Sequence, residues 1–157
     1  MNHHIIRLLI ITLTLFTSLN LSAKDAILTT GFNHVGLTVT DLNASTSFFV
    51  DTLGWELKGK DTSYPASFVS DGAMLITLWQ AIKPDEAVSF DRKNNVGLHH
   101  LAISVKNIES LNILYERFKT VPGVVIEFAP ELFYKGPSQH MMIREPSGNR
   151  LEFKSIN

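Results

Sequence analysis

The sequence predicts an α+β fold made of two similar modules, each containing one strand, one helix and three further strands. The first observation is a weak internal repeat, in which residues 32–39 can be laid on residues 98–105. In both copies apolar residues stand at every second position, which is typical of a strand with one buried face. The second observation is that each copy runs into apolar residues at helical spacing. Neither module alone buries much surface, so we expect the two to pack into a single domain.

Residues at the segment ends give the expected limits of each element. Asp41 can cap the first helix, which Gly54 ends, and Asn107 can cap the second, which ends before Gly123. Three short strands are expected after each helix, over residues 55–60, 66–70 and 73–79, and then 124–129, 139–144 and 150–154. Module one therefore spans residues 31–79, a linker spans residues 80–97, and module two spans residues 98–157.

Residues 1–23 have the pattern of a secretory signal peptide. Arg7 precedes a short apolar run, and small residues lead to an expected cleavage after Ala23. The apolar run is short for a membrane span of about 20 residues. We therefore expect a secreted or periplasmic protein, without a membrane anchor after cleavage, whose single domain covers residues 24–157.

The composition restricts the partners and the metal chemistry. The net charge of -1 recruits neither nucleic acid nor an anionic membrane, so the expected partner is a small molecule. The absence of cysteine excludes disulfides, thiolate metal sites and cysteine nucleophiles. Any metal must therefore be held by carboxylates and by some of the six histidines.

Strand alternation predicts a metal site on the face turned away from the helices. In each first strand a histidine, His34 or His100, starts the set of small residues on that face. In the last strand Leu151 and Phe153 fit the helix side, so Glu152 joins the same face. Two imidazoles and one carboxylate could bind Mn, Fe, Ni or Zn. Glu152 is the expected catalytic residue as well as a ligand.

Other side chains are expected near this site. His140 and Arg144 share a strand face and could orient an anionic substrate. Counting from the turn glycines matches Ile76 with Glu152, which predicts an apolar wall in module one. His99 should point to the opposite face from His100 and be structural. The further candidates for substrate contact are Tyr64, Ile76, His140 and Arg144, with Tyr134 beside them.

Three segments resemble the vicinal oxygen chelate superfamily, which includes glyoxalase I, fosfomycin-resistance proteins, extradiol dioxygenases and bleomycin-resistance proteins. They read FNHVGLTVTDLNASTSFFVDTLGWEL, HHLAISVKNIESLNILYERF and REPSGNRLEF. The resemblance implies paired βαβββ modules that form a curved, incompletely closed mixed sheet around a cleft, with the helices outside. It also implies metal ligands at His34, His100 and Glu152. Glu145 stands where the family ending has an Asp.

The resemblance implies a metalloenzyme with glyoxalase-like lyase, isomerase or transferase chemistry on a small oxygen-rich substrate, in the manner of lactoylglutathione lyase, and the pattern of residues 1–23 adds that it is exported. A non-haem Fe(II) extradiol dioxygenase is the first alternative, and Met142 in place of a Tyr counts against it. A non-catalytic binding or resistance protein is the second, and the three retained ligands argue against it. Ile76 at the fourth ligand place departs from glyoxalase I. Two chains could also form a homodimer, with or without exchange of modules.

Overall fold

The computed structural model describes residues 28–156, so the expected signal peptide at residues 1–23 lies outside the described residues. The chain divides into a unit that ends at Gly31 and a unit that begins at Phe32. The second unit carries the strands and helices described below. Within residues 28–156 no helix combines the length and the apolar character needed to cross a membrane.

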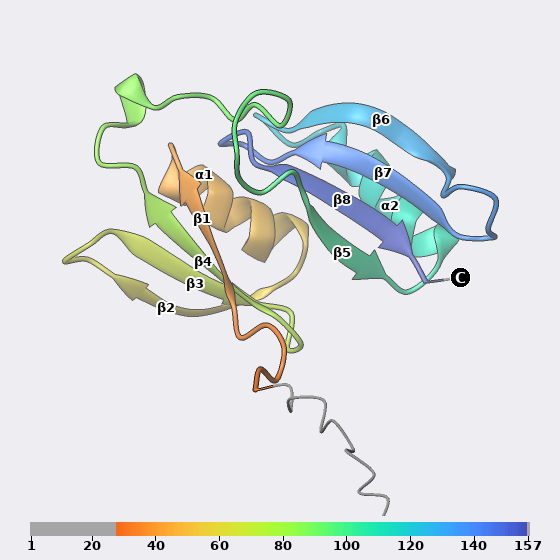
Figure 1. Ribbon diagram of the computed structural model, residues 1–157, viewed down its shortest axis with the longest axis horizontal. Helices are drawn as coiled ribbons and strands as arrows, with labels where there is room; N and C mark the ends of the chain where they lie inside the picture. Colours follow the sequence, from red (N-terminus) through yellow and green to blue (C-terminus); the bar gives the residue numbers. More distant parts are fainter. Residues whose placement is uncertain (1–27, 157) are drawn as a thin grey trace, which may run out of the picture. The chain divides into compact units, whose positions relative to one another are not determined.

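The folded unit contains two four-stranded mixed sheets, one from each module (Figure 1). The first sheet has the order β1-β4-β3-β2 and the second has the order β5-β8-β7-β6. In each sheet the first and last strands of the module pair in parallel, and the other pairs are antiparallel. The strands of module one are β1 (Val35–Val39), β2 (Glu56–Asp61), β3 (Ala66–Ser70) and β4 (Leu75–Gln80). Those of module two are β5 (Leu101–Val105), β6 (Val125–Leu132), β7 (Gln139–Arg144) and β8 (Arg150–Ser155). The α+β class and the repeated strand order are confirmed.

Each module has one helix, which begins at the residue that the sequence predicts. Asp41 accepts a hydrogen bond from the Ala44 amide at 2.9 Å and caps α1 (Leu42–Ser47). A π-helical segment (Phe48–Thr52) continues α1, and Gly54 ends it at a φ of 77°. Asn107 caps α2 (Ile108–Phe118) in the same way. The linker between the modules contains one 3₁₀ turn, η2 (Pro84–Glu86).

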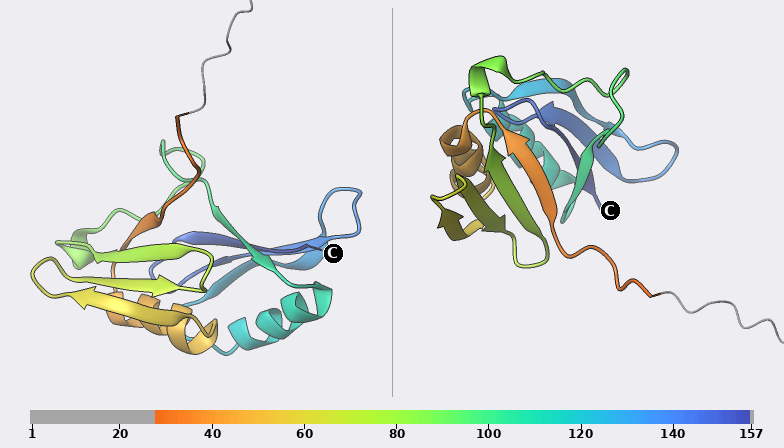
Figure 2. Two further views of the ribbon diagram at one scale, coloured as in Figure 1. Left: turned by 90° about the horizontal axis from the view of Figure 1, so that it is seen from below. Right: turned by 60° about the vertical axis from the view of Figure 1, so that its left-hand side comes forward.

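The two modules share one apolar core, which lies between the helices and the sheets. The ring of Phe48 lies 5.6 Å from that of Phe118, so the helical segments of the two modules contact each other directly. Both helices lie on the same side of the sheets (Figure 2). Alternate strand residues such as Leu37 and Ile103 point into this core. The opposite face of each sheet is therefore left for a ligand.

A buried polar network ties module two to the start of the first helix. Glu145 is fully buried, and its carboxylate accepts hydrogen bonds from the Ser45 hydroxyl at 2.6 Å and the Asn149 amide at 3.0 Å. The neighbouring Ser147 hydroxyl accepts from the Thr40 amide at 3.1 Å. A buried carboxylate with several donors strongly favours one arrangement of its partners. The turn between β7 and β8 therefore fixes how the two modules pack.

Candidate active site

Several ionisable side chains lie together on the open face of the second sheet. They line a pocket of about 510 Å³ over β7 and β8. Its polar residues are His99, His100, Glu131, His140, Arg150 and Glu152. Its apolar wall consists of Phe128, Leu132, Phe133, Tyr134 and Met142. The pocket therefore combines a polar floor with an aromatic side.

Glu152 is the centre of the polar floor. It is 6% exposed, and its Oε2 lies 3.1 Å from His100 Nε2. Its Oε1 lies 2.5 Å from His140 Nδ1, and the His140 ring is flanked by Phe128 and Phe133 at centroid distances of 5.0 and 4.9 Å. A carboxylate only accepts, so His140 Nδ1–H donates in the hydrogen bond to Glu152, whereas His100 Nε2 is in close contact with the other carboxylate oxygen. The structure thus brings His100 and Glu152 together, as expected, and adds His140 to them.

His99 is not turned away from the site, so the expectation that it points to the opposite face from His100 is wrong. Residues 99 and 100 precede β5, which begins at Leu101, so strand alternation does not govern them. His99 Nδ1 lies 2.8 Å from His100 Nδ1, and His99 lines the same pocket. Desolvation, followed by the positive charge of Arg150, lowers the pKa of His99 and favours its neutral form.

A second polar cluster lies next to Glu152. The Glu127 carboxylate accepts from Arg150 Nε at 2.7 Å and from Arg144 Nε at 2.9 Å. Burial by itself raises the pKa of Glu127, but the hydrogen bonds and charges of the two arginines outweigh it, so this pKa lies below its usual range. Arg144 also donates to the Phe90 carbonyl at 3.2 Å and does not line the pocket that holds Glu152.

His34 lies apart from Glu152 within the chain. It is exposed, and its Nδ1 contacts Asn33 Oδ1 at 2.8 Å. It lines a neighbouring pocket of about 410 Å³, which His100 also reaches. Among residues 28–156 no three His, Asp or Glu side chains come close enough to hold a metal ion. One chain therefore presents His100 and Glu152 as a pair, with His34 separate.

Ile76 is not on the open face, so the expected apolar wall is wrong at this position. Ile76 is fully buried and pairs with Val35, which places it on the core side of the first sheet. Thr77 pairs with Gly36 and occupies the open face instead. Its hydroxyl accepts a hydrogen bond from Trp79 Nε1 at 2.8 Å. Thr77, a hydroxyl residue, therefore corresponds to Glu152.

The error at Ile76 has a simple geometric cause. In module two β8 begins at Arg150, two residues after Gly148, whereas in module one β4 begins at Leu75, three residues after Gly72. The additional turn residue shifts every later side chain by one position, which reverses its face. The polar side chain of Thr77 is the signal in the sequence, because the open-face positions of the neighbouring strand β1, Gly36 and Thr38, also carry small or polar residues.

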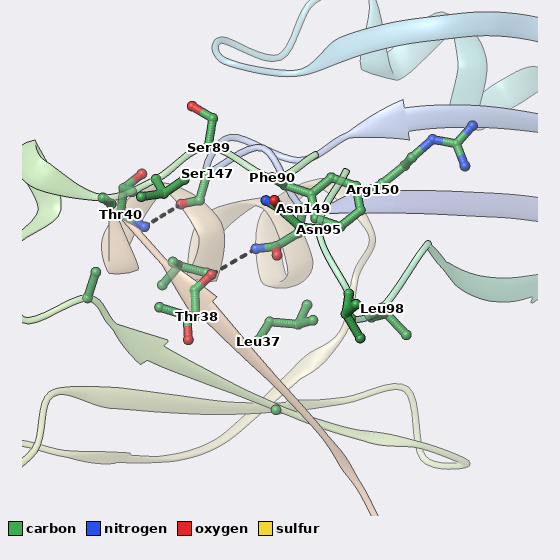
Figure 3. A pocket seen from close by; sticks show the side chains of 17 residues that line it. Leu37, Thr38, Thr40, Ser89, Phe90, Asn95, Leu98, Ser147, Asn149 and Arg150 are labelled. Atoms are coloured by element: carbon green, nitrogen blue, oxygen red, sulfur yellow. Dashed lines mark hydrogen bonds between the residues drawn. The ribbon is translucent and has the colours of Figure 1, made fainter. Parts of the chain in front are cut away.

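Tyr64, another predicted substrate contact, does not line the Glu152 pocket. Tyr64 is half exposed and packs on Trp79 at a centroid distance of 5.1 Å, in module one. A further pocket of about 370 Å³ lies beside β1 and includes Thr38 and Asn149, which share a hydrogen bond (Figure 3). The Arg150 side chain runs away from Thr38 in this view (Figure 3), and Arg150 lines both this pocket and the Glu152 pocket.

Comparison with known proteins gives the same fold. A curated relative, 2-epi-5-epi-valiolone epimerase of Actinomyces sp, is 27% identical over an alignment of 146 positions, and the match covers 79% of this chain and 78% of the relative. Lactoylglutathione lyase of Agrobacterium tumefaciens has a TM-score of 0.60 at 21% identity, with 83% of this chain and 96% of that chain covered. The fosfomycin resistance protein FosX of Listeria monocytogenes has a TM-score of 0.64 at 19% identity, with 82% and 95% covered.

The family assignment rests on a match over nearly the whole folded unit. The sequence pattern described as the Glyoxalase/Bleomycin resistance protein/Dioxygenase superfamily matches residues 31–153. This range includes the first sheet, the second sheet except the end of β8, and all residues that line the Glu152 pocket. The chain therefore belongs to the glyoxalase/bleomycin resistance protein/dioxygenase superfamily.

Proposed function

We propose that this protein is a metal-dependent enzyme with glyoxalase-like lyase or isomerase chemistry on a small oxygen-rich molecule. The observation that carries the proposal is the contact of the Glu152 carboxylate with His100 in a pocket over an open sheet face. Glu152 is 6% exposed and has no Lys or Arg partner among residues 28–156. A buried carboxylate paired only with imidazoles is an arrangement suited to a cation.

His100 Nε2 and Glu152 Oε2 are the atoms that would hold the metal. Imidazole and carboxylate accept Mn, Fe, Ni or Zn, so the donor chemistry of this pair fits such an ion. A divalent ion bound there would polarise neighbouring oxygens of a substrate and stabilise developing negative charge. Two donors from one chain leave other positions free for the substrate and for further ligands.

Two neighbouring histidines would orient the ligands. The Nδ1–H of His140 donates to Oε1 of Glu152, which leaves Oε2 directed toward His100. If His100 uses Nε2 as a ligand, its Nδ1 carries the proton and can donate to His99 Nδ1, 2.8 Å away. The lowered pKa of His99 keeps this acceptor available. Such outer partners fix the tautomer and ring orientation of metal-binding histidines.

The comparisons support an isomerase or lyase in preference to a dioxygenase. The curated relative is an epimerase, and one of the solved structures is a lactoylglutathione lyase. A mutant of the Listeria FosX protein has been solved with Mn(II) and 1S,2S-dihydroxypropylphosphonic acid, an oxygen-rich molecule. Met142 stands opposite Glu152 in the β7–β8 register and provides no hydroxyl group. The dioxygenase alternative therefore lacks the tyrosine that the family resemblance calls for.

A second copy of the chain would complete the ligand set. His34 is exposed, and exposed apolar side chains surround its pocket, with Phe32 99% and Leu98 49% exposed. An interface here would bury these side chains and bring the partner's His34 toward His100 and Glu152 of this chain. Twofold symmetry would make two equivalent sites. This proposal explains why His34, a histidine at a repeat position, has no other metal-binding side chain beside it within residues 28–156.

Metal analysis tests the proposed function. Protein purified without a polyhistidine tag should contain near-stoichiometric divalent metal, whereas His100→Ala and Glu152→Ala should lower its affinity by about 100-fold or more, because each removes a ligand. Glu131→Ala is the matched control, since its carboxylate is 62% exposed at the rim of the same pocket. Unchanged metal content in His100→Ala and Glu152→Ala would refute the site.

We also propose that the protein is exported and loses residues 1–23. The support is the order of Arg7, the apolar run and the small residues that end at Ala23. The full-length gene, expressed in a bacterial host, should yield periplasmic protein whose mature sequence starts at Lys24. Intact-mass measurement of the periplasmic fraction checks the cleavage position, and a cytoplasmic protein that retains Met1 would contradict export.

A further inference from the structure

The guanidinium of Arg150 is a cation with free hydrogen-bonding capacity beside the Glu152 pocket. Arg150 is 7% exposed and lines the pocket together with His100 and Glu152. It precedes Glu152 by two residues in β8, so both side chains rise from the same face of the sheet. Its charged end therefore lies next to the proposed reaction centre.

The contacts of Arg150 leave its terminal nitrogens without a strong acceptor. Nε donates to Glu127 at 2.7 Å, and Nη1 lies 3.5 Å from His99 Nδ1. That imidazole nitrogen already exchanges a hydrogen bond with His100 at 2.8 Å, so its single lone pair or proton is in use. Among residues 28–156 the Arg150 guanidinium makes no further hydrogen bond to a carboxylate or carbonyl oxygen.

Arg150 shares its carboxylate partner with a second arginine. Glu127 is shared with Arg144, so one carboxylate neutralises two guanidinium groups. Glu152 is engaged by His100 and His140, and Glu131 lies at the rim with 62% of its side chain exposed. A desolvated guanidinium whose Nη atoms have no carboxylate partner can bind an oxyanion through two parallel hydrogen bonds.

The wall beside this cation defines the rest of the ligand. Phe128, Phe133 and Tyr134 line the same pocket, and the ring centroids of Phe133 and Tyr134 lie 4.7 Å apart. Tyr134 is 85% exposed at a φ of 53°, a conformation that few side chains adopt. Aromatic faces of this kind bind flat or apolar groups.

We propose that the substrate is an organic acid whose carboxylate binds Arg150 while its apolar or aromatic body packs against Phe128 and Phe133. This inference rests on the proposed function in placing the reaction at Glu152, but the binding of the carboxylate does not require a metal. It assigns the substrate class of the site: a carboxylic acid with an apolar body and a neighbouring oxygen group.

Benzoate and its neutral isostere benzamide test the inference with the purified protein after treatment with EDTA. Titration calorimetry or ligand-observed NMR should give benzoate at least about tenfold tighter binding than benzamide, since a charge-assisted pair replaces a neutral contact. Arg150→Gln should remove this preference. Arg144→Gln is the matched control, because it also takes one arginine from Glu127 but does not line the pocket, so it should keep the preference.

The possible results separate this inference from the metal site. A preference for benzoate that is lost in Arg150→Gln and kept in Arg144→Gln supports the anion site, whatever the metal content. Equal binding of benzoate and benzamide to the native protein overturns it, and so does an unchanged preference in Arg150→Gln. Arg150→Lys, which keeps the charge but not the planar fork, is the second variant if Arg150→Gln does not fold, and it should weaken benzoate binding.

Discussion

An equimolar mixture of His34→Ala and Glu152→Ala proteins should regain about a quarter of the native metal sites, although each variant alone regains none. In a twofold dimer each site would combine His34 of one chain with His100 and Glu152 of the other. The mixed dimer then carries both substitutions in one site and leaves the other intact. Half of the dimers are mixed after random exchange, and one of their two sites is native.

The expectation follows from the separation of the ligands within the chain. Glu152 contacts His100 and His140, whereas His34 is exposed and contacts Asn33. Metal content and activity of the mixture would be measured after mild unfolding and refolding, which allows the chains to exchange. A mixture of His100→Ala with Glu152→Ala is the control. Each site takes His100 and Glu152 from a single chain, so every site in this mixture lacks one of the two ligands.

The outcome separates two arrangements of the site. If the mixture of His34→Ala and Glu152→Ala stays without metal while each variant is folded and dimeric, His34 does not act on a neighbouring chain. Recovery in the control mixture would show that His100 and Glu152 belong to different sites, against the 3.1 Å contact between them. Recovery in the first mixture alone supports a site shared by two chains.

The alternation of side chains between the two faces of a strand is the reason that part of this site could be predicted from the sequence. The alternation Leu151, Glu152, Phe153 has one register compatible with a buried core, so the face of Glu152 followed directly. The helix caps at Asp41 and Asn107 could also be predicted, because a cap depends only on the side chain and the next few residues. The two-module α+β fold follows from repetition of these local patterns.

The errors arise where one residue more or less changes the geometry. Ile76 was assigned to the wrong face because the turn before β4 has one residue more than its counterpart before β8. His99 was misplaced because β5 begins after it. The first error is a residue count across a turn and the second extends a strand beyond its first residue, and both fail because side chains alternate between faces only inside a strand.

Side-chain contacts between neighbouring strands of the second sheet could not be predicted from the sequence alone. His140 reaches Glu152 because β7 and β8 pair with Met142 opposite Glu152. Glu127 reaches Arg144 and Arg150 from β6, whose pairing with β7 has two register shifts. Irregularities of this kind re-aim side chains and leave no periodic signal.

Replacing Glu127 by glutamine should lower the free energy of unfolding by about 3–5 kcal/mol, because it leaves the desolvated Arg150 without a counterion. The Arg150 side chain is 6% exposed, and Glu127 is its only carboxylate partner among residues 28–156. Urea unfolding at neutral pH measures the loss. Glu131→Gln is the control, since its side chain is 62% exposed and its contact with His140 spans 3.7 Å, and it should change stability by less than about 0.5 kcal/mol.

The pH dependence of the same variant identifies the cause. The pKa of Glu127 is lowered from its ordinary value of 4.5, so the unfolded chain binds a proton more readily than the folded one. The stabilisation by Glu127 is therefore complete above pH 4.5 and is lost as the pH falls through the lowered folded value. The native protein should lose stability over that acid range, and Glu127→Gln should show a smaller loss there. Parallel curves for the two proteins would contradict the charge-based account.

Removing both charges separates an uncompensated cation from lost packing. In Glu127→Gln the guanidinium of Arg150 stays buried with Arg144 beside it, whereas in the double variant Glu127→Gln/Arg150→Met the buried charge is gone. If the single variant is unstable because of the uncompensated cation, the double variant should recover most of the loss, as buried ion pairs often do when replaced as a unit. If packing is the cause, the two losses should add. The recovered protein would still lack the preference for benzoate, because the cation that holds the carboxylate would be absent.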